Sequence, residues 1–316
     1  MTSLPTRVAD SLQARFLASV ATRLVRPPSI ALTTREVAEP ERLLVPTRHG
    51  QVRCTVTRAA AGAPLATGAG SPPVHVHLHG GAFLVGGPQQ DDHLVRGIAG
   101  EVGATVVNVD YSAGHRVRFP RAHEEVSDVL RWVQRSGDVM GWDGTRVSIS
   151  GVSAGGNLSL GALELGRRAG DPPLRAGVLV VPFVDATLQP EQYTSPLPPA
   201  AAREHPPFVS PRLTRLVQGH YFADAARRSE PLASPVLGDE ELAALPPLLV
   251  VTAERDSIRA QDERFVEAAR ARGASVTTSC VAGVDHGFPQ SSETEDEAGI
   301  RELAELMRAH LTAHLA

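Results

Sequence analysis

The chain alternates short β-branched runs with segments of helical period. The apolar runs cover residues 74–78, 105–109, 146–149, 177–181 and 248–252. Between them, apolar residues recur every three or four positions as on one helix face, in sets such as Leu94, Val95, Ile98, Ala99 and Val102, or Val126, Val129, Leu130 and Val133. This alternation predicts an α/β fold with a mostly parallel sheet and helices on both faces. In such sheets ligands bind at the carboxyl ends of the strands, so the residues after each strand are the first functional candidates.

Two stretches interrupt the alternation and predict an appended cap. Residues 1–45 contain one or two amphipathic helices, the clearest over residues 12–24. Residues 184–230 form a long insertion after a strand, rich in proline, with a helix start at Ser210-Pro211. Such an insertion can lie over the site as a lid. The alternative is a surface loop that makes no contact with the substrate. We therefore expect an N-terminal cap segment (1–45), a core in two parts (46–183 and 231–316) and a cap insertion (184–230).

The composition of the chain excludes some classes of binding partner and some catalytic mechanisms. The net charge of −4 and the pI near 6.3 argue against nucleic acid or an acidic membrane surface as a partner. All 31 basic residues are arginine, which excludes lysine Schiff-base chemistry, a P-loop lysine and a Ser-Lys dyad. Arginines break every apolar stretch near the N-terminus, so we expect no signal-peptide core, no stable membrane insertion and a cytoplasmic location. Cys54 and Cys280 are then expected to be buried, reduced thiols.

A serine flanked by glycines follows the strand at residues 146–149. The hexapeptide Gly151-Val152-Ser153-Ala154-Gly155-Gly156 stands between that strand and a helical segment, so it predicts a sharp strand-turn-helix. Small neighbours allow a strained serine backbone, and the turn exposes the hydroxyl of Ser153 at the top of the sheet. The motif is common by itself, so its interpretation depends on the residues around it.

A glycine loop follows the strand at residues 74–78. It reads His79-Gly80-Gly81-Ala82-Phe83, and its glycines let backbone N–H groups approach a bound oxygen without interference from a Cβ atom. Together with the N–H of Ala154, the N–H groups of Gly80 and Gly81 are candidates for an oxyanion hole. A flexible glycine turn without this role stays the alternative.

A serine nucleophile needs a base, and the base needs a group that orients it. Asp256 follows the strand at residues 248–252, and His286 lies in a turn after the next strand-like run. The order Ser153, Asp256, His286 is the order in which triad members follow successive strands of an α/β-hydrolase. Glu254 and Asp285 are competing acids, but Glu254 is nearer the strand body and Asp285 adjoins the base itself.

Three histidines alternate along one strand. His75, His77 and His79 share a face of the sheet, which raises the possibility of metal binding. No separate cluster of acids or thiols supplies the remaining ligands of such a metal site. The strand also leads directly into the glycine loop, which gives it another role. The sequence therefore predicts neither a metal nor a cofactor.

With these residues together, the chain resembles the hormone-sensitive-lipase-like branch of the α/β-hydrolase carboxylesterases, the bacterial family IV. The shared pieces are the HGGAF loop (79–83), the GVSAGG turn (151–156), the acid within ERDSIR (254–259) and the HGF turn (286–288). The resemblance is strong over residues 74–288. It implies the α/β-hydrolase fold with a helical cap, formed by residues 1–45 and 184–230, and a preference for short-acyl esters.

The chain departs from the family pattern at four places. Ala82 stands where the family has a third glycine, Val152 where it has aspartate, and Ser257 where it has proline. The family's Arg-Leu-Ala-Pro-Glu is replaced over residues 112–116. None of these changes removes a triad atom, but they predict modest activity on generic test esters or an unusual substrate.

The sequence thus predicts a serine carboxylesterase that works through an acyl-enzyme on a small-molecule ester. Ser153, Asp256 and His286 are its candidate catalytic residues, with Gly80, Gly81 and Ala154 as the oxyanion hole. Two alternatives stay open: a ligand-binding pseudo-hydrolase, and the same triad acting on a lactone, an amide or an acetylated natural product. A homodimer also stays open.

Overall fold

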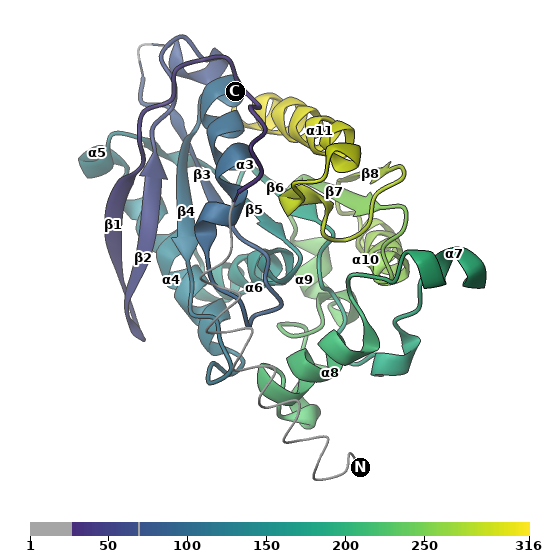
Figure 1. Cartoon of the computed structure of the whole chain (residues 1–316). Coiled ribbons are helices and arrows are strands. Elements are labelled where there is room, and N and C mark those ends of the chain that lie inside the picture. The colour runs from purple at the N-terminus through teal and green to yellow at the C-terminus, as the bar shows by residue number, and fades with distance from the viewer. Residues whose placement is uncertain (1–26, 69) are drawn as a thin grey trace.

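A single eight-stranded sheet runs through the structure, a computed structural model that describes residues 27–68 and 70–316. Its strand order is β1-β2-β4-β3-β5-β6-β7-β8 (Figure 1). β1 pairs antiparallel with β2 and β2 with β4, and every other pair is parallel. The strands are β1 (Glu41–Thr47), β2 (Gly50–Thr57), β3 (Pro73–Leu78), β4 (Thr105–Asp110), β5 (Asp143–Val152), β6 (Ala176–Val180), β7 (Leu248–Ala253) and β8 (Val276–Val281).

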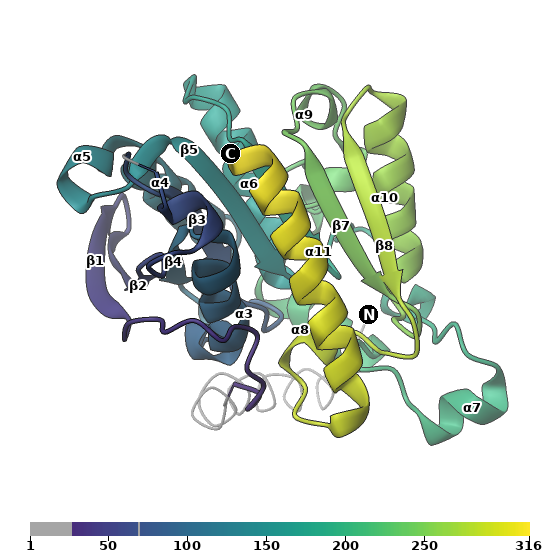
Figure 2. The same ribbon diagram turned by 90° about the horizontal axis from the view of Figure 1, so that it is seen from above.

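Helices cover both faces of this sheet, as Figure 2 shows. The helices are α3 (Asp92–Gly97), α4 (Arg121–Arg135), α5 (Gly137–Met140), α6 (Ala154–Ala169), α7 (Pro199–Glu204), α8 (Pro211–His220), α9 (Glu240–Ala243), α10 (Arg259–Ala271) and α11 (Glu297–Leu315). α4, α6 and α10 pack on one face, while α3 and α11 pack on the other. The predicted α/β fold is confirmed, including helices on both faces.

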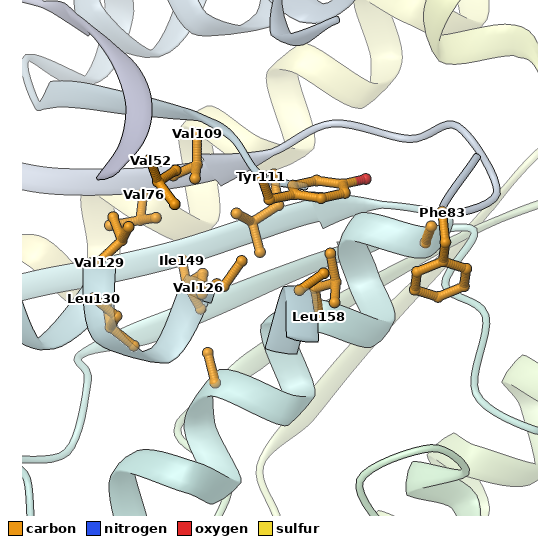
Figure 3. Packing of buried hydrophobic residues seen from close by; sticks show 14 of the residues in the cluster. Val52, Val76, Phe83, Val109, Tyr111, Val126, Val129, Leu130, Ile149 and Leu158 are labelled. Carbon is orange, nitrogen blue, oxygen red and sulfur yellow. The ribbon is translucent and has the colours of Figure 1, made fainter. Parts of the chain in front are cut away.

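The alternation of side chains along the strands explains the two cores. In β4, Val107 and Val109 face the core under α4 and α6, whereas Val106 faces the core under α3 and α11. Figure 3 shows the first of these cores, where Val126, Val129 and Leu130 of α4 meet the sheet. Burial on both faces explains why β4, β6 and β7 are mostly apolar along their whole length. In β3 and β5 one side is buried but polar, because His75 and His77 hydrogen-bond there to Ser148 and Ser150.

The two segments expected to form the cap, residues 1–45 and 184–230, differ from each other in structure. The predicted helix over residues 12–24 lies outside the described residues, and β1 begins at Glu41, five residues inside the predicted segment 1–45. Thr33 and Arg35, also from that segment, both hydrogen-bond to Glu101, which follows α3. The insertion 184–230 contains α7 and α8. Within the described ranges, no helix has both the length and the apolarity that crossing a bilayer requires.

The prediction for the cysteines is right for one and wrong for the other. Cys54 is buried in the sheet, but Cys280 is exposed, and both are free thiols. β8 is the last strand of the sheet, and most of its residues are partly or fully exposed. A β-branched run at a sheet edge has the same sequence pattern as a buried strand, so burial of Cys280 could not be inferred from it.

We predict that Cys280 alone reacts with an aromatic disulfide reagent in the native protein. Burial raises the pKa of the Cys54 thiol to about 12, so little thiolate forms there at pH 8. Counting the released chromophore should give one fast thiol, which Cys280→Ser abolishes and Cys54→Ser leaves intact. Fast reaction of Cys54 in the folded protein would contradict its burial.

Candidate active site

Three side chains from the carboxyl ends of β5, β7 and β8 form one hydrogen-bonded row. The distance from Ser153 Oγ to His286 Nε2 is 2.8 Å, and from His286 Nδ1 to Asp256 Oδ2 it is 2.7 Å. The second carboxylate oxygen of Asp256 accepts the N–H of Ile258 at 2.9 Å. Because an ionised carboxylate can only accept, it selects the tautomer with the proton on Nδ1, and Nε2 is then left to accept the serine proton.

The turn at Ser153 has the strained backbone expected from its sequence. Ser153 has φ 54°, and it directly precedes α6. A Cβ atom on Gly151 would lie 2.1 Å from the carbonyl oxygen of Gly155, and one on Gly155 would lie 2.2 Å from that of Leu78. Only glycine fits at these contacts. The strained residue is held on both sides, because Ser153 donates its N–H to Val180 and accepts the N–H of Phe183.

The glycine loop is oriented by hydrogen bonds to its carbonyl groups. The Tyr111 hydroxyl donates to the carbonyl of His79 at 2.7 Å, and its ring stacks on that histidine with centroids 4.2 Å apart. The carbonyl of Gly80 lies 2.6 Å from His79 Nδ1 and accepts the amide of Gln90 at 3.3 Å. In a trans peptide the C=O and the N–H point in opposite directions, so these bonds also fix where the N–H groups of Gly80 and Gly81 point.

A mostly apolar cavity of about 290 Å³ joins the serine, the histidine and the glycine loop. The predicted oxyanion residues Gly80, Gly81 and Ala154 all line it together with Ser153 and His286. The insertion 184–230, which the sequence predicts to be a cap, contributes a wall of the cavity. That wall comprises Phe208, Val209, Leu213, Thr214 and Val217.

The two competing acids have other partners. Glu254 accepts the N–H of Gly283, and Asp285 accepts the N–H groups of His286 and Phe208. Neither carboxylate has a hydrogen bond to the imidazole ring. Among the described residues, only Asp256 makes one, so the geometry favours the acid that the strand order selects.

Two of the three alternating histidines, His75 and His77, form part of a buried polar row, whereas His79 follows the end of β3 and belongs to the glycine loop. His75 lies between the hydroxyls of Ser148 and Ser150, each at 2.7 Å, and burial lowers its pKa well below the usual value, so it is neutral. His77 continues the row from Ser150 to Asp91, at 2.8 and 3.0 Å. Across residues 27–68 and 70–316, no group of three or more His, Cys, Asp and Glu side chains is arranged to hold a metal ion.

The structure shows the environment of three residues that depart from the family pattern, Val152, Ser112 and Ala82. Val152 is buried in the apolar core beneath α3 and α11. In the 112–116 segment, Ser112 binds the carboxylate of Glu125 through both its N–H and its hydroxyl, and Arg121 binds the same carboxylate. Three hydrogen bonds from Ser112 and Arg121 thus hold the Glu125 carboxylate. Ala82, in place of glycine, adopts φ 53°.

Sequence reasoning missed two polar residues, Gln290 and Asp262. Gln290 lines the cavity and donates to Asp91 at 2.8 Å, which ties the histidine turn to the end of the buried row. Asp262 of α10 is fully buried, and no described residue donates a hydrogen bond to either of its carboxylate oxygens. The sequence offered one sign that Gln290 lies near the site, because it stands only four residues after His286. Asp262 had none, because an acid in a charged helix is usually exposed.

Comparison with known proteins gives one matching family model and many relatives. Residues 75–290 match the model described as the alpha/beta hydrolase fold. The carboxylesterase NlhH of Mycobacterium tuberculosis is 32% identical over 75% of this chain and 74% of its own. An ethyl acetate hydrolase of Pseudomonas putida is 27% identical over 75% and 73%. Carboxyl esterase 2 of the fungus Tuber melanosporum superposes with TM-score 0.77 at 25% identity, covering all of both chains.

We predict that Ala82→Gly raises the free energy of unfolding by about 1 kcal/mol, because alanine is strained at positive φ and glycine is not. Denaturation in urea measures the change. Ala309→Gly, the same substitution on the exposed side of α11, is the control and should lower stability by about 1 kcal/mol. Equal losses in the two variants would show that Ala82 is not strained.

We also predict that Asp262→Asn stabilises the protein increasingly as the pH rises. Burial, and secondarily the charges of Asp256 and Glu263, raise the pKa of Asp262 well above its usual value. The folded state therefore keeps a proton that the unfolded state releases above about pH 4, so wild-type stability falls as the pH rises toward the raised pKa.

Urea midpoints at pH 4, 6 and 8 test this, with Glu267→Gln on the exposed face of the same helix as the control. The asparagine variant should match the parent near pH 4 and exceed it at pH 8. A constant difference across the series would mean that Asp262 does not titrate on unfolding.

Proposed function

The chain belongs to the α/β-hydrolase family, in its hormone-sensitive-lipase-like branch, and we propose that it hydrolyses small carboxylic esters through an acyl-enzyme on Ser153. The observation that carries the proposal is the unbroken row from Ser153 through His286 to Asp256, at 2.8 and 2.7 Å, open to a cavity of about 290 Å³. The relatives named as carboxylesterase and ethyl acetate hydrolase support the reaction class.

In the first half-reaction, Ser153 Oγ attacks the ester carbonyl carbon while His286 Nε2 takes its proton. Asp256 keeps the imidazole oriented through Nδ1 and stabilises the imidazolium that forms. His286 then gives the proton to the alcohol oxygen as its bond to the carbonyl carbon breaks. The products are the free alcohol and an acyl group on Ser153.

In the second half-reaction, water takes the place of the alcohol. His286 removes a proton from the water as its oxygen attacks the acyl carbon, and then returns a proton to Ser153 Oγ as the acid leaves. In both steps the carbonyl oxygen carries negative charge in the tetrahedral state. We assign its stabilisation to the N–H groups of Gly80, Gly81 and Ala154, whose residues line the same cavity as Ser153.

The size and lining of the cavity favour small apolar esters. Its volume lies at the lower end of the range for small-molecule sites, and its walls are mostly apolar. We assign the substrate-facing role of the cap to residues 184–230, since five of them line the cavity. A cytoplasmic location and a possible homodimer stay predictions of the sequence.

The binding-only alternative is not favoured, because the nucleophile, base and acid are all present and hydrogen-bonded to one another. A lactone, an amide or an acetylated natural product would use the same atoms, so these substrates extend the proposal rather than oppose it.

We predict that Ser153→Ala lowers kcat for p-nitrophenyl acetate by about 10³-fold or more, because the nucleophile is lost while the cavity is kept. Initial rates of purified protein measure the loss. Ser229→Ala, an exposed serine of the cap insertion that does not line the cavity, is the control and should keep parental activity. Parental turnover by Ser153→Ala would exclude the acyl-enzyme at this residue.

A further inference from the structure

An exposed aromatic ring of the cap lies against the base of the triad. The ring of Phe208 stacks on the His286 imidazole, with centroids 5.8 Å apart and planes 23° apart. A Cβ atom on Gly287 would come within 3.0 Å of the same ring, so the glycine after His286 makes room for it. Phe208 is 61% exposed although it lines the cavity. A large apolar residue that is both exposed and part of a cavity wall is available to an incoming ligand.

Two hydrogen bonds fasten this part of the cap to the loops of the triad. The carboxylate of Asp285 accepts the N–H of Phe208 at 2.9 Å and, through its other oxygen, the N–H of His286 at 2.7 Å. The hydroxyl of Ser257 donates to the carbonyl of Val209 at 2.7 Å. Asp285 and Ser257 each adjoin a triad member, His286 and Asp256. The ring is therefore positioned by the same loops that position the base and the acid.

Ser257 stands where the resembling family has proline. Proline carries no hydroxyl, so the bond to Val209 is available to this chain and not to one with the family residue. The departure is thus explained as an attachment point for the cap.

The chemistry decides which part of an ester Phe208 would contact. His286 Nε2 must deliver its proton to the alcohol oxygen as the alcohol leaves, so that oxygen lies within hydrogen-bond reach of Nε2. A ring stacked on the same imidazole therefore adjoins the alcohol portion. The acyl portion is bonded to Ser153 and stays there during the second half-reaction.

We propose that Phe208 determines specificity for the alcohol portion of the ester and favours aromatic alcohols, with Ser257 holding its segment in place. The proposal rests on the proposed ester hydrolysis. Aromatic pairs are favourable in offset-stacked or edge-to-face geometry, and the exposed side chain of Phe208 in the cavity wall is available for such a contact.

Benzyl acetate and ethyl acetate test the proposal, because they form the same acetyl-enzyme and release alcohols of similar leaving ability. The ratio of kcat/KM for benzyl over ethyl acetate should fall about three- to tenfold in Phe208→Ala. Phe208→Trp should keep the ratio, and Phe208→Leu, which keeps apolar bulk without the ring, should lower it. Ser257→Ala should lower it by a smaller factor, since the ring remains but is held less firmly.

Leu237→Ala, another exposed large apolar residue that does not line the cavity, is the control and should leave the ratio unchanged. A merely structural role of Phe208 would lower kcat/KM for both esters in parallel, and that result overturns the proposal, as does an unchanged ratio in Phe208→Ala. If the parent protein hydrolyses neither ester and a fluorophosphonate does not label Ser153, the proposed function itself fails and this inference fails with it.

Discussion

The hydrogen bond between His286 and Asp256 is the interaction on which the site depends. In the proposed mechanism it fixes the imidazole tautomer that leaves Nε2 ready to accept the proton of Ser153. The bond can form because β7 and β8 are parallel neighbours, so the loops after their carboxyl ends meet at one edge of the sheet. β5, two strands from β7 in the sheet, brings Ser153 to the same edge. The strand order of the sheet therefore brings the three side chains of the candidate active site together.

Much of this arrangement could be predicted from the sequence. Each predicted strand overlaps an observed one, because short runs rich in β-branched residues mark the strands and the helices between them keep a clear period. Ser153, Asp256 and His286 could be selected because each follows a strand, and their order matched a known pattern. The structure places the three side chains in one hydrogen-bonded row at the carboxyl ends of their strands.

Other features depend on contacts between distant segments, and no local pattern encodes them. Cys280 is exposed because β8 is an edge strand, and a β-branched run does not reveal its place in a sheet. Gln290 meets Asp91, and Phe208 meets His286, across long separations in the chain. Asp262 lies on a helix whose polar pattern suggests exposure, yet its side chain is enclosed. The contacts and the exposure of these residues therefore had to come from the structure.

The proposed mechanism requires that Ser153 carries the acyl group during turnover. Mass spectrometry of protein quenched with acid soon after mixing with p-nitrophenyl acetate measures this directly. An acyl-enzyme mechanism predicts a mass increase of one acetyl group, which peptide mapping locates on Ser153 and which is absent from Ser153→Ala treated in the same way. Steady hydrolysis with no covalent adduct, or an adduct on another residue, would contradict it.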